Sequence, residues 1–369
     1  MARNNALVVV NSVYQLLTAV HLARTLLQGR ETDLLLTNVT PALPGLRQRL
    51  EETGLFARVV LAKGAELQGR CHLNRPEELD ACFQNREALL RGALSGELGE
   101  YGAVYFANFD VLARLLACRY DHTACRFFWY EDGFSSYVID YLRPDRAAAN
   151  RHPLAGKIAH QVEAALLYQP GLALRGDRIP NLALPKLPQG DGGLLETLDF
   201  LFSYQPLRDP ADVLFLEQSF RAENIPGNDL ELMGRCREAV GPGRFLVKPH
   251  PRNPQNIALE RGLTRPWHGD APWELYLLHG DLAGKTVVTV CSNGALAGRL
   301  ALDPPSGERV VLLYRLFTGK VLWKEDPVLR RYLDRFCREQ GGQGVFAPET
   351  VYQLENYLRY VGGEHGKTT

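Results

Sequence analysis

The stretch Arg126-Phe127-Phe128-Trp129-Tyr130-Glu131-Asp132-Gly133 sets the pattern from which the fold can be derived. Its run of aromatic residues is typical of a buried strand. The run ends at two acids and a glycine, the residue that most readily lets a chain turn. Ligands of open α/β sheets bind beyond the carboxyl ends of the strands. Glu131 and Asp132 are therefore candidate site residues.

Two further polar motifs follow predicted strands in the same way. Lys248-Pro249-His250-Pro251-Arg252 follows a strand at 244–247, and Cys291-Ser292-Asn293-Gly294 follows a strand at 286–290. Because all three motifs stand at strand ends, we expect them to converge on one cleft. In that arrangement Glu131 of the amino-terminal half faces His250 of the carboxy-terminal half.

Strand and helix patterns alternate along both halves of the chain, which predicts parallel sheets. The amino-terminal half is predicted to hold strands at 6–10, 33–37, 58–61, 104–107 and 126–130, with helices at 13–27, 46–52 and 111–118. The carboxy-terminal half is predicted to hold strands at 198–203, 244–247, 286–290 and 309–313, with helices at 211–222, 229–240, 295–302 and 350–360. The predicted fold class is α/β, with two Rossmann-like doubly wound domains facing a central cleft.

Prolines and glycines crowd residues 178–193 without apolar periodicity, which is typical of an interdomain linker. We therefore predict an N-terminal Rossmann-like domain at 1–185 and a C-terminal Rossmann-like domain at 186–348. Residues 349–369 are predicted to form a C-terminal helix and tail, which could pack back on the N-terminal domain.

The composition excludes several classes of protein. A chain of 369 residues with 46% hydrophobic and 23% charged residues is typical of a soluble, globular protein of two domains. Its 42 basic residues balance its 42 acidic ones, and no basic stretch is interleaved with aromatics, so no nucleic-acid partner is expected. The absence of a G-x-G-x-x-G or Walker sequence disfavours a dinucleotide oxidoreductase and a P-loop NTPase.

Cysteine usage and the first residues bear on location. The seven cysteines include no C-x-x-C pair, which argues against a disulfide framework and a zinc site and favours a reducing compartment. The apolar run at 6–10 is too short for a signal peptide or a membrane span. We therefore predict a cytoplasmic protein, for which peripheral association with the inner face of the cytoplasmic membrane stays open.

The paired acids suit proton transfer. Neighbouring side chains on a strand point to opposite sides, so one acid should face the cleft while the other braces the turn at Gly133. A carboxylate that is half-buried or beside another acid has a raised pKa, which suits a general base that takes a proton from a hydroxyl. The alternative is an exposed acidic turn, but the buried character of 127–130 favours a site.

The other two motifs suit an anion. Prolines fix the backbone on both sides of His250, and the flanking Lys248 and Arg252 predict a cationic pocket for phosphate. The alternative is an ordinary histidine in the core or in a turn. Ser292 and Asn293 precede a predicted helix, where a hydroxyl and backbone N–H groups can hold an anion, although Ser292 could equally be only an N-cap. Cys291 is most simply a small buried residue.

Together these motifs resemble those of bacterial sialyltransferases, in the lineage of lipooligosaccharide sialyltransferases and capsular polysialyltransferases. The resemblance rests on an acidic D/E-D/E-G motif at 131–133, an HP motif at His250-Pro251 and an approximate S motif at Ser292. Two further matches are Tyr14-Gln15-Leu16-Leu17 after the first strand, and the predicted strand at 200–203 running into Gln205-Pro206-Leu207. The chain has Cys291-Ser292-Asn293 where the family usually has paired hydroxyl residues.

The resemblance implies a GT-B fold and the inverting transfer of sialic acid, or a related CMP-activated acidic sugar, from a CMP-sugar to a glycan or glycolipid acceptor. By it, Glu131 is the catalytic base, Asp132 a supporting acid, and His250 the residue that contacts the donor phosphate and acts as general acid. The donor-binding candidates are Lys248, Pro251, Arg252, Ser292, Asn293 and Gln205. The candidates for the acceptor side of the cleft are Asn11, Gln15, Asn108 and Ser135. No metal or other cofactor is expected.

Two alternatives stay open from the sequence. One is a GT-B enzyme of another class, such as a transferase or an epimerase that uses a UDP-sugar. The other is a protein without catalytic activity that binds a glycan or a nucleotide on the same scaffold. Donor hydrolysis with release of CMP would separate a CMP-sugar transferase from the first alternative. Loss of turnover but not of CMP binding in Glu131→Ala would separate an enzyme from a binding protein.

Overall fold

The computed structural model describes residues 4–250, 252–269, 271–340 and 344–364. The chain forms two compact units, one of Met1–Lys186 with Gly192–Ser203 and one of Leu187–Asp191 with Tyr204–Thr369. The segment predicted to be a linker is structured. Within it, β7 (Asn181–Ala183) is a strand of the first unit's sheet, and β8 (Leu187–Pro188) pairs with β12 (Leu302–Asp303) in the second unit.

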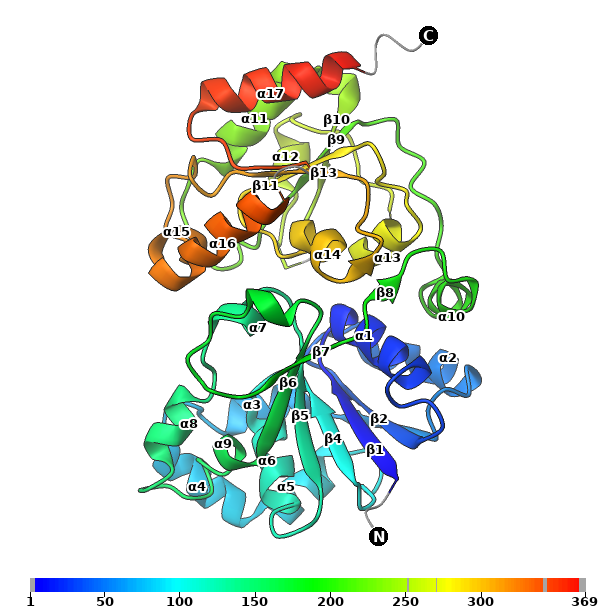
Figure 1. Ribbon diagram of the computed structural model, residues 1–369, viewed down its shortest axis with the longest axis vertical. Coiled ribbons are helices and arrows are strands. Elements are labelled where there is room, and N and C mark those ends of the chain that lie inside the picture. The colour runs from blue at the N-terminus through cyan, green and yellow to red at the C-terminus, as the bar shows by residue number, and fades with distance from the viewer. Residues whose placement is uncertain (1–3, 251, 270, 341–343, 365–369) are drawn as a thin grey trace. The chain divides into compact units, whose positions relative to one another are not determined.

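The first unit is built on a parallel sheet of seven strands in the order β3-β2-β1-β4-β5-β6-β7 (Figure 1). The other strands of this sheet are β1 (Asn5–Val10), β2 (Glu31–Thr37), β3 (Arg58–Ala62), β4 (Ala103–Phe106), β5 (Arg126–Tyr130) and β6 (Val162–Leu167). Their apolar runs are buried almost throughout, because helices cover both faces of a parallel sheet.

The connections of the first sheet reverse direction between β1 and β4. From β1 the chain runs outward through β2 to β3, and from β4 it runs the other way to β5 and β6. Right-handed crossovers then place the helices of the two runs on opposite faces. The helices of the first unit are α1 (Val13–Arg24), α2 (Arg47–Glu52), α3 (Gly64–Arg70), α4 (Pro76–Gln84), α5 (Arg86–Ala93), α6 (Val111–Arg119), α7 (Ser135–Val138), α8 (Arg143–Ala148), α9 (Ile158–Gln161) and α10 (Gly192–Phe202), with short 3-10 turns at Leu43–Leu46 and Pro170–Leu172.

The second unit contains a parallel sheet of five strands in the order β10-β9-β11-β13-β14. Its strands are β9 (Val213–Leu216), β10 (Phe245–Lys248), β11 (Thr286–Thr289), β13 (Arg309–Leu312) and β14 (Val345–Phe346). Its helices are α11 (Asp229–Val240), α12 (Ile257–Glu260), α13 (Trp273–Leu278), α14 (Gly294–Leu300), α15 (Leu322–Glu325), α16 (Pro327–Gln340) and α17 (Val351–Glu364), with a 3-10 turn at Pro242–Arg244. The direction reverses between β9 and β11, so this unit is also Rossmann-like.

The α/β fold class with two Rossmann-like halves is thus confirmed, but two predicted elements are wrong. The predicted strand at 198–203 is the end of α10, whose buried Leu194, Leu198 and Leu201 recur at helical spacing. The predicted helix at 211–222 instead contains β9, a run of four buried apolar residues.

The last helix of the chain, α17, lies along α11 of the second unit (Figure 1). This contact lies within the second unit. Among the described residues, no helix combines the length and the apolar character needed to cross a membrane.

Candidate functional site

The first unit carries a polar network at the carboxyl edge of its sheet, around the reversal point between β1 and β4. The Asn11 side chain, after β1, donates to Asn108 Oδ1 (2.9 Å) and to Asp110 Oδ2 (2.8 Å), both after β4. The hydroxyl of Thr37, at the end of β2, donates to Asn11 Oδ1 (2.7 Å). Gln15 donates to Asn108 Oδ1 (2.7 Å) and accepts the Asn11 N–H (2.7 Å). The network therefore joins the ends of three neighbouring strands.

Burial separates the roles of the residues predicted to line the acceptor side. Asn11 and Gln15 are buried, so they support the edge from beneath. Asn108 and Ser135 are part-exposed. These two can meet a ligand directly.

Asp132 connects β5 to this network. Its Oδ2 accepts a hydrogen bond from Asn108 Nδ2 (3.1 Å), and its N–H donates to Ser136 Oγ (2.9 Å). Burial raises the pKa of Asp132, and hydrogen bonds from Gln15 and Asn108 oppose that rise. Its side chain is nevertheless part-exposed. Gly133 then turns the chain at a φ of 80°, a conformation that favours glycine.

Glu131 is the fully buried acid of the pair, with an exposed fraction of 0%. Its Oε2 accepts hydrogen bonds from the Tyr137 hydroxyl and the Tyr168 N–H (3.0 Å), and its Oε1 accepts one from the Tyr14 hydroxyl (3.3 Å). Burial is the largest influence and raises the pKa of Glu131 to about 7, against the effect of these donors. Of the two acids, only Asp132 is directly open to a ligand.

Arg175 holds the loop that follows β5, a role that the sequence does not reveal. Its side chain, paired with Asp177 (2.7 Å), is almost completely buried. The guanidinium lies over the Trp129 ring (4.6 Å to the centroid) and donates to the Ser136 backbone carbonyl (2.5 Å). Because Ser136 also receives the Asp132 N–H, Arg175 helps to fix the position of the acidic turn.

In the second unit, Glu217 organises the carboxyl edge. It directly follows β9 and is buried. Its Oε2 accepts the His250 N–H (2.9 Å), and its Oε1 pairs with Arg221 (2.7 Å), which also pairs with Asp229 (2.9 Å). The sequence did not single out Glu217, because the predicted helix at 211–222 concealed a strand that ends at an acid.

His250 is presented as a neutral imidazole. Its Nδ1 accepts the Arg252 N–H (3.2 Å), so the ring proton belongs on Nε2. Burial and the nearby Arg252 and Lys248 lower the pKa of His250 to about 4. At neutral pH this part-exposed side chain can therefore donate a hydrogen bond through Nε2–H without carrying a charge.

The cations beside His250 are engaged with other groups. Arg252 pairs with Glu223 (2.9 Å) and donates to Ser219 Oγ (3.0 Å). The ammonium of Lys248 lies over the Trp267 ring (5.8 Å), and burial lowers its pKa. Arg252 is thus half of an ion pair, whereas Lys248 lies against an aromatic ring. Pro251 lies outside the described residues.

The third motif approaches the same edge from β11. The Cys291 thiol donates to Gln218 Oε1 (3.2 Å), which joins the ends of β11 and β9 at their reversal point. Ser292 Oγ accepts the Gly294 N–H (3.3 Å) and is part-exposed, while Asn293 is exposed. Gln205 is exposed on the segment of chain between α10 and β9.

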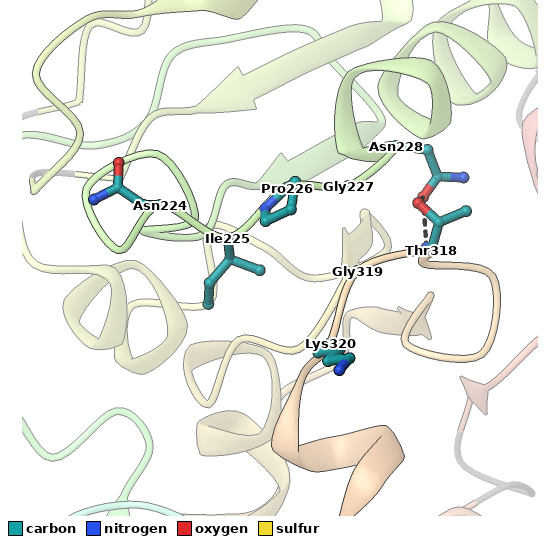
Figure 2. Close-up of a pocket in the computed structure, with 8 residues that line it drawn as sticks. All are labelled: Asn224, Ile225, Pro226, Gly227, Asn228, Thr318, Gly319 and Lys320. Atoms are coloured by element: carbon teal, nitrogen blue, oxygen red, sulfur yellow. Dashed lines mark hydrogen bonds between the residues drawn. The ribbon is translucent and has the colours of Figure 1, made fainter.

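A cavity of about 620 Å³ opens at this edge between the loops that follow β9 and β13 (Figure 2). It is lined by Asn224, Ile225, Pro226, Gly227, Asn228, Thr318, Gly319 and Lys320. Asn228 Oδ1 accepts hydrogen bonds from the Thr318 N–H (2.9 Å) and hydroxyl (3.3 Å), which ties the two loops together. A Cβ atom on Gly227 would lie 2.1 Å from the Phe317 ring, so only glycine fits there without a shift.

Comparisons with known proteins support no family by sequence. No protein-family model matches the chain, and no curated protein matches it. The UDP-GlcNAc 2-epimerase from Methanocaldococcus jannaschii is similar in structure, with 9% identity and a TM-score of 0.47 over 97% of this chain and 91% of that chain. LpCGTa in complex with UDP is similar in structure with 13% identity and a TM-score of 0.49, over 98% of this chain and 91% of that chain. The UDP-GlcNAc 2-epimerase from Neisseria meningitidis bound to UDP-GlcNAc has 10% identity and a TM-score of 0.41, over 97% of this chain and 94% of that chain.

These comparisons overturn the predicted sialyltransferase resemblance. The similar structures are UDP-GlcNAc 2-epimerases and a protein bound to UDP rather than sialyltransferases, and no sequence match restores that family. The prediction of CMP-sialic acid, or of another CMP-sugar, as donor is therefore wrong. The fold supplies one physical reason, because the supposed strand at 200–203 that carried one of the motif matches is helical.

Proposed function

We propose that the protein is an inverting glycosyltransferase that moves a sugar from a nucleotide sugar to a glycan acceptor. The observation that carries the proposal is Glu131, a buried carboxylate at the end of β5 whose described partners are tyrosines and a backbone N–H. A pKa of about 7 lets this group take up and release a proton near neutral pH. That property suits a general base for the hydroxyl of an incoming acceptor.

The carboxyl edge of the first unit suits a sugar acceptor. Its part-exposed groups are Tyr14, Asn108, Asp132 and Ser135. They combine donors and acceptors without a concentration of charge, and sugar hydroxyls need both. The buried network beneath them keeps these groups in fixed positions before the acceptor arrives.

The carboxyl edge of the second unit suits the nucleotide. His250 Nε2–H and the Ser292 hydroxyl offer neutral donors to phosphate oxygens, and the 620 Å³ cavity bordered by Lys320 has room for a nucleoside. UDP-sugars are the first donors to test, because LpCGTa was solved with UDP and the Neisseria meningitidis epimerase with UDP-GlcNAc. We propose that the transfer needs no metal, so EDTA should leave turnover unchanged.

The test is nucleotide release by the full chain from a panel of UDP-sugars, with GDP- and CMP-sugars as comparisons. Glu131→Gln should lower turnover by about 10²–10⁴-fold while UDP binding, measured calorimetrically, is retained. Glu163→Gln is the matched control, because Glu163 is an exposed acid of the neighbouring strand β6. A wild-type protein that binds UDP but releases no nucleotide from any donor would instead be a binding protein.

A further inference from the structure

Glu131 presents an accessibility problem for a base. A general base must reach the proton that it removes, directly or through one intervening group. The side chain of Glu131 has no exposed surface, whereas the hydroxyl that lies 3.3 Å from its Oε1 belongs to the part-exposed Tyr14. Tyr14 therefore connects a buried acid with the surface of the candidate site.

The two oxygens of Glu131 have different surroundings. Oε2 is held by the Tyr137 hydroxyl and the Tyr168 N–H. Both of those residues are buried, with exposed fractions of 0% and 4%, so neither leads outward. The Tyr168 hydroxyl instead bonds the Thr18 hydroxyl (3.2 Å). Tyr14, on Oε1, is the part-exposed partner.

Local structure fixes the position of Tyr14. It is the second residue of α1, which begins directly after β1. Ser12 caps this helix by accepting the Gln15 N–H (3.2 Å), and Gln15 is tied to Asn108 at the end of β4. Tyr14 thus stands at the reversal point of the sheet, where a ligand is expected.

We propose that Tyr14 is a catalytic residue that relays the acceptor's proton to Glu131, an inference that rests on the proposed function. The acceptor hydroxyl gives its proton to Tyr14 Oη while Tyr14 gives its own proton to Glu131 Oε1. The freed electron pair on the acceptor oxygen forms the bond to the sugar's anomeric carbon. The bond from that carbon to the nucleotide phosphate breaks, and its electron pair leaves on the phosphate oxygen. Tyr14 ends neutral and Glu131 ends protonated.

The groups that face Glu131 define what a pH profile should report. They are Tyr14 from α1, Tyr137 from α7, Tyr168 after β6 and the neighbouring Asp132. The Tyr14 hydrogen bond lowers the pKa of Glu131, whereas burial and the charge of Asp132 raise it. Removal of the Tyr14 hydroxyl should therefore move the titration of Glu131 to higher pH.

The test compares Tyr14→Phe with Tyr105→Phe, a buried tyrosine of β4 whose ring stacks on Phe128 (5.1 Å). We expect Tyr14→Phe to lower kcat by about 10–10³-fold with a donor KM within about twofold of wild type. The acid limb of the variant's pH profile of kcat should move to higher pH. The plot of kcat against the D₂O fraction in mixed H₂O and D₂O should change from curved for the wild type to linear for the variant. Tyr105→Phe should keep the wild-type profile.

Different failures have different meanings. If the wild type turns over a nucleotide sugar but Tyr14→Phe behaves like Tyr105→Phe, the relay is wrong and the proposed function stands. If Asp132→Asn abolishes turnover while Glu131→Gln and Tyr14→Phe keep it, the base is Asp132 and the relay is again wrong. If the wild type transfers no sugar from any donor, the proposed function fails and the relay fails with it. Melting temperatures of the variants show whether each one is folded.

Discussion

The carboxyl edges of the two sheets place a buried glutamate in opposite settings. In the first unit, Glu131 meets two phenol hydroxyls and a backbone N–H, and its pKa rises to about 7. In the second unit, Glu217 meets the guanidinium of Arg221 and the His250 N–H. Both acids follow the carboxyl end of a strand, Glu131 beside the reversal point of its sheet and Glu217 at the reversal point of its own.

The difference shows how partners decide the role of a buried acid. A buried carboxylate with only neutral donors loses more from desolvation than these hydrogen bonds restore, so its pKa rises toward neutral pH. A carboxylate beside a guanidinium is held in place as half of an ion pair. We infer that the first unit supplies proton transfer, while the second supplies fixed hydrogen-bond donors such as His250 Nε2–H.

The largest expected effect concerns the pH dependence of stability. The folded protein keeps a proton on Glu131 up to about pH 7, whereas the ordinary value for a glutamate is 4.5. Between these values the folded state binds more protons than the unfolded state, so the free energy of unfolding falls as pH rises. The fall attributable to Glu131 is about 3 kcal/mol by pH 8.

Glu131→Gln should remove this part of the decline. The measurement is urea unfolding of both proteins at several pH values between 4.5 and 8, followed by circular dichroism and tryptophan fluorescence. The difference between wild type and variant isolates Glu131, because other titrating groups are common to both. An equal decline in both proteins would show that Glu131 is ionised in the fold like an ordinary glutamate, which would remove the contrast with Glu217.

A smaller effect tests the cavity of the second unit. Gly227→Ala would place a methyl group 2.1 Å from the ring of Phe317, which is itself stacked on Phe220 (4.6 Å). The strain should cost about 1–3 kcal/mol and weaken UDP binding. Gly234→Ala in α11 is the control, because among the described residues no atom beyond its chain neighbours and its own helix backbone lies within 4 Å of the added carbon, and alanine favours helix. We expect Gly227→Ala to lower the melting temperature and Gly234→Ala to raise it. Equal changes in the two variants would contradict the close packing of Gly227 against Phe317.

The parts of the fold that follow from local pattern were predictable. The apolar run at 6–10 and the cap at Ser12 correspond to β1 and α1, and Ser12 does accept the Gln15 N–H. The helix α10 escaped prediction although its leucines have helical spacing, because the prolines and glycines before it suggested a linker. For α10, the helical spacing of the leucines was therefore a better predictor of structure than the proline and glycine content of the preceding residues.

The site was predictable only in its strand-end residues. Glu131, Asp132 and His250 follow strands, so their place at a sheet edge could be inferred from sequence. Tyr168 lies 37 positions from Glu131, and only the pairing of β5 with β6 brings its N–H to the carboxylate. Partners of this kind, which set the pKa of Glu131, depend on tertiary structure and leave no local signal.

The smallest expected effect is a difference in pH dependence between UDP binding at the second unit's edge and turnover, which depends on Glu131 at the first unit's edge. Because the pKa of His250 is lowered to about 4, its imidazole stays neutral from pH 6 to 8, and UDP affinity should not change through this group. His250→Ala should weaken UDP binding by about 5–10-fold, the value of one hydrogen bond, by a similar factor across that range. Turnover should rise over the same range as Glu131 loses its proton. Calorimetry of UDP binding to both proteins at pH 6, 7 and 8 checks this expectation. The contrary result is a wild-type affinity that rises toward pH 6 while the affinity of His250→Ala stays constant. It would mean that His250 becomes charged in this range and that both sheet edges exchange protons.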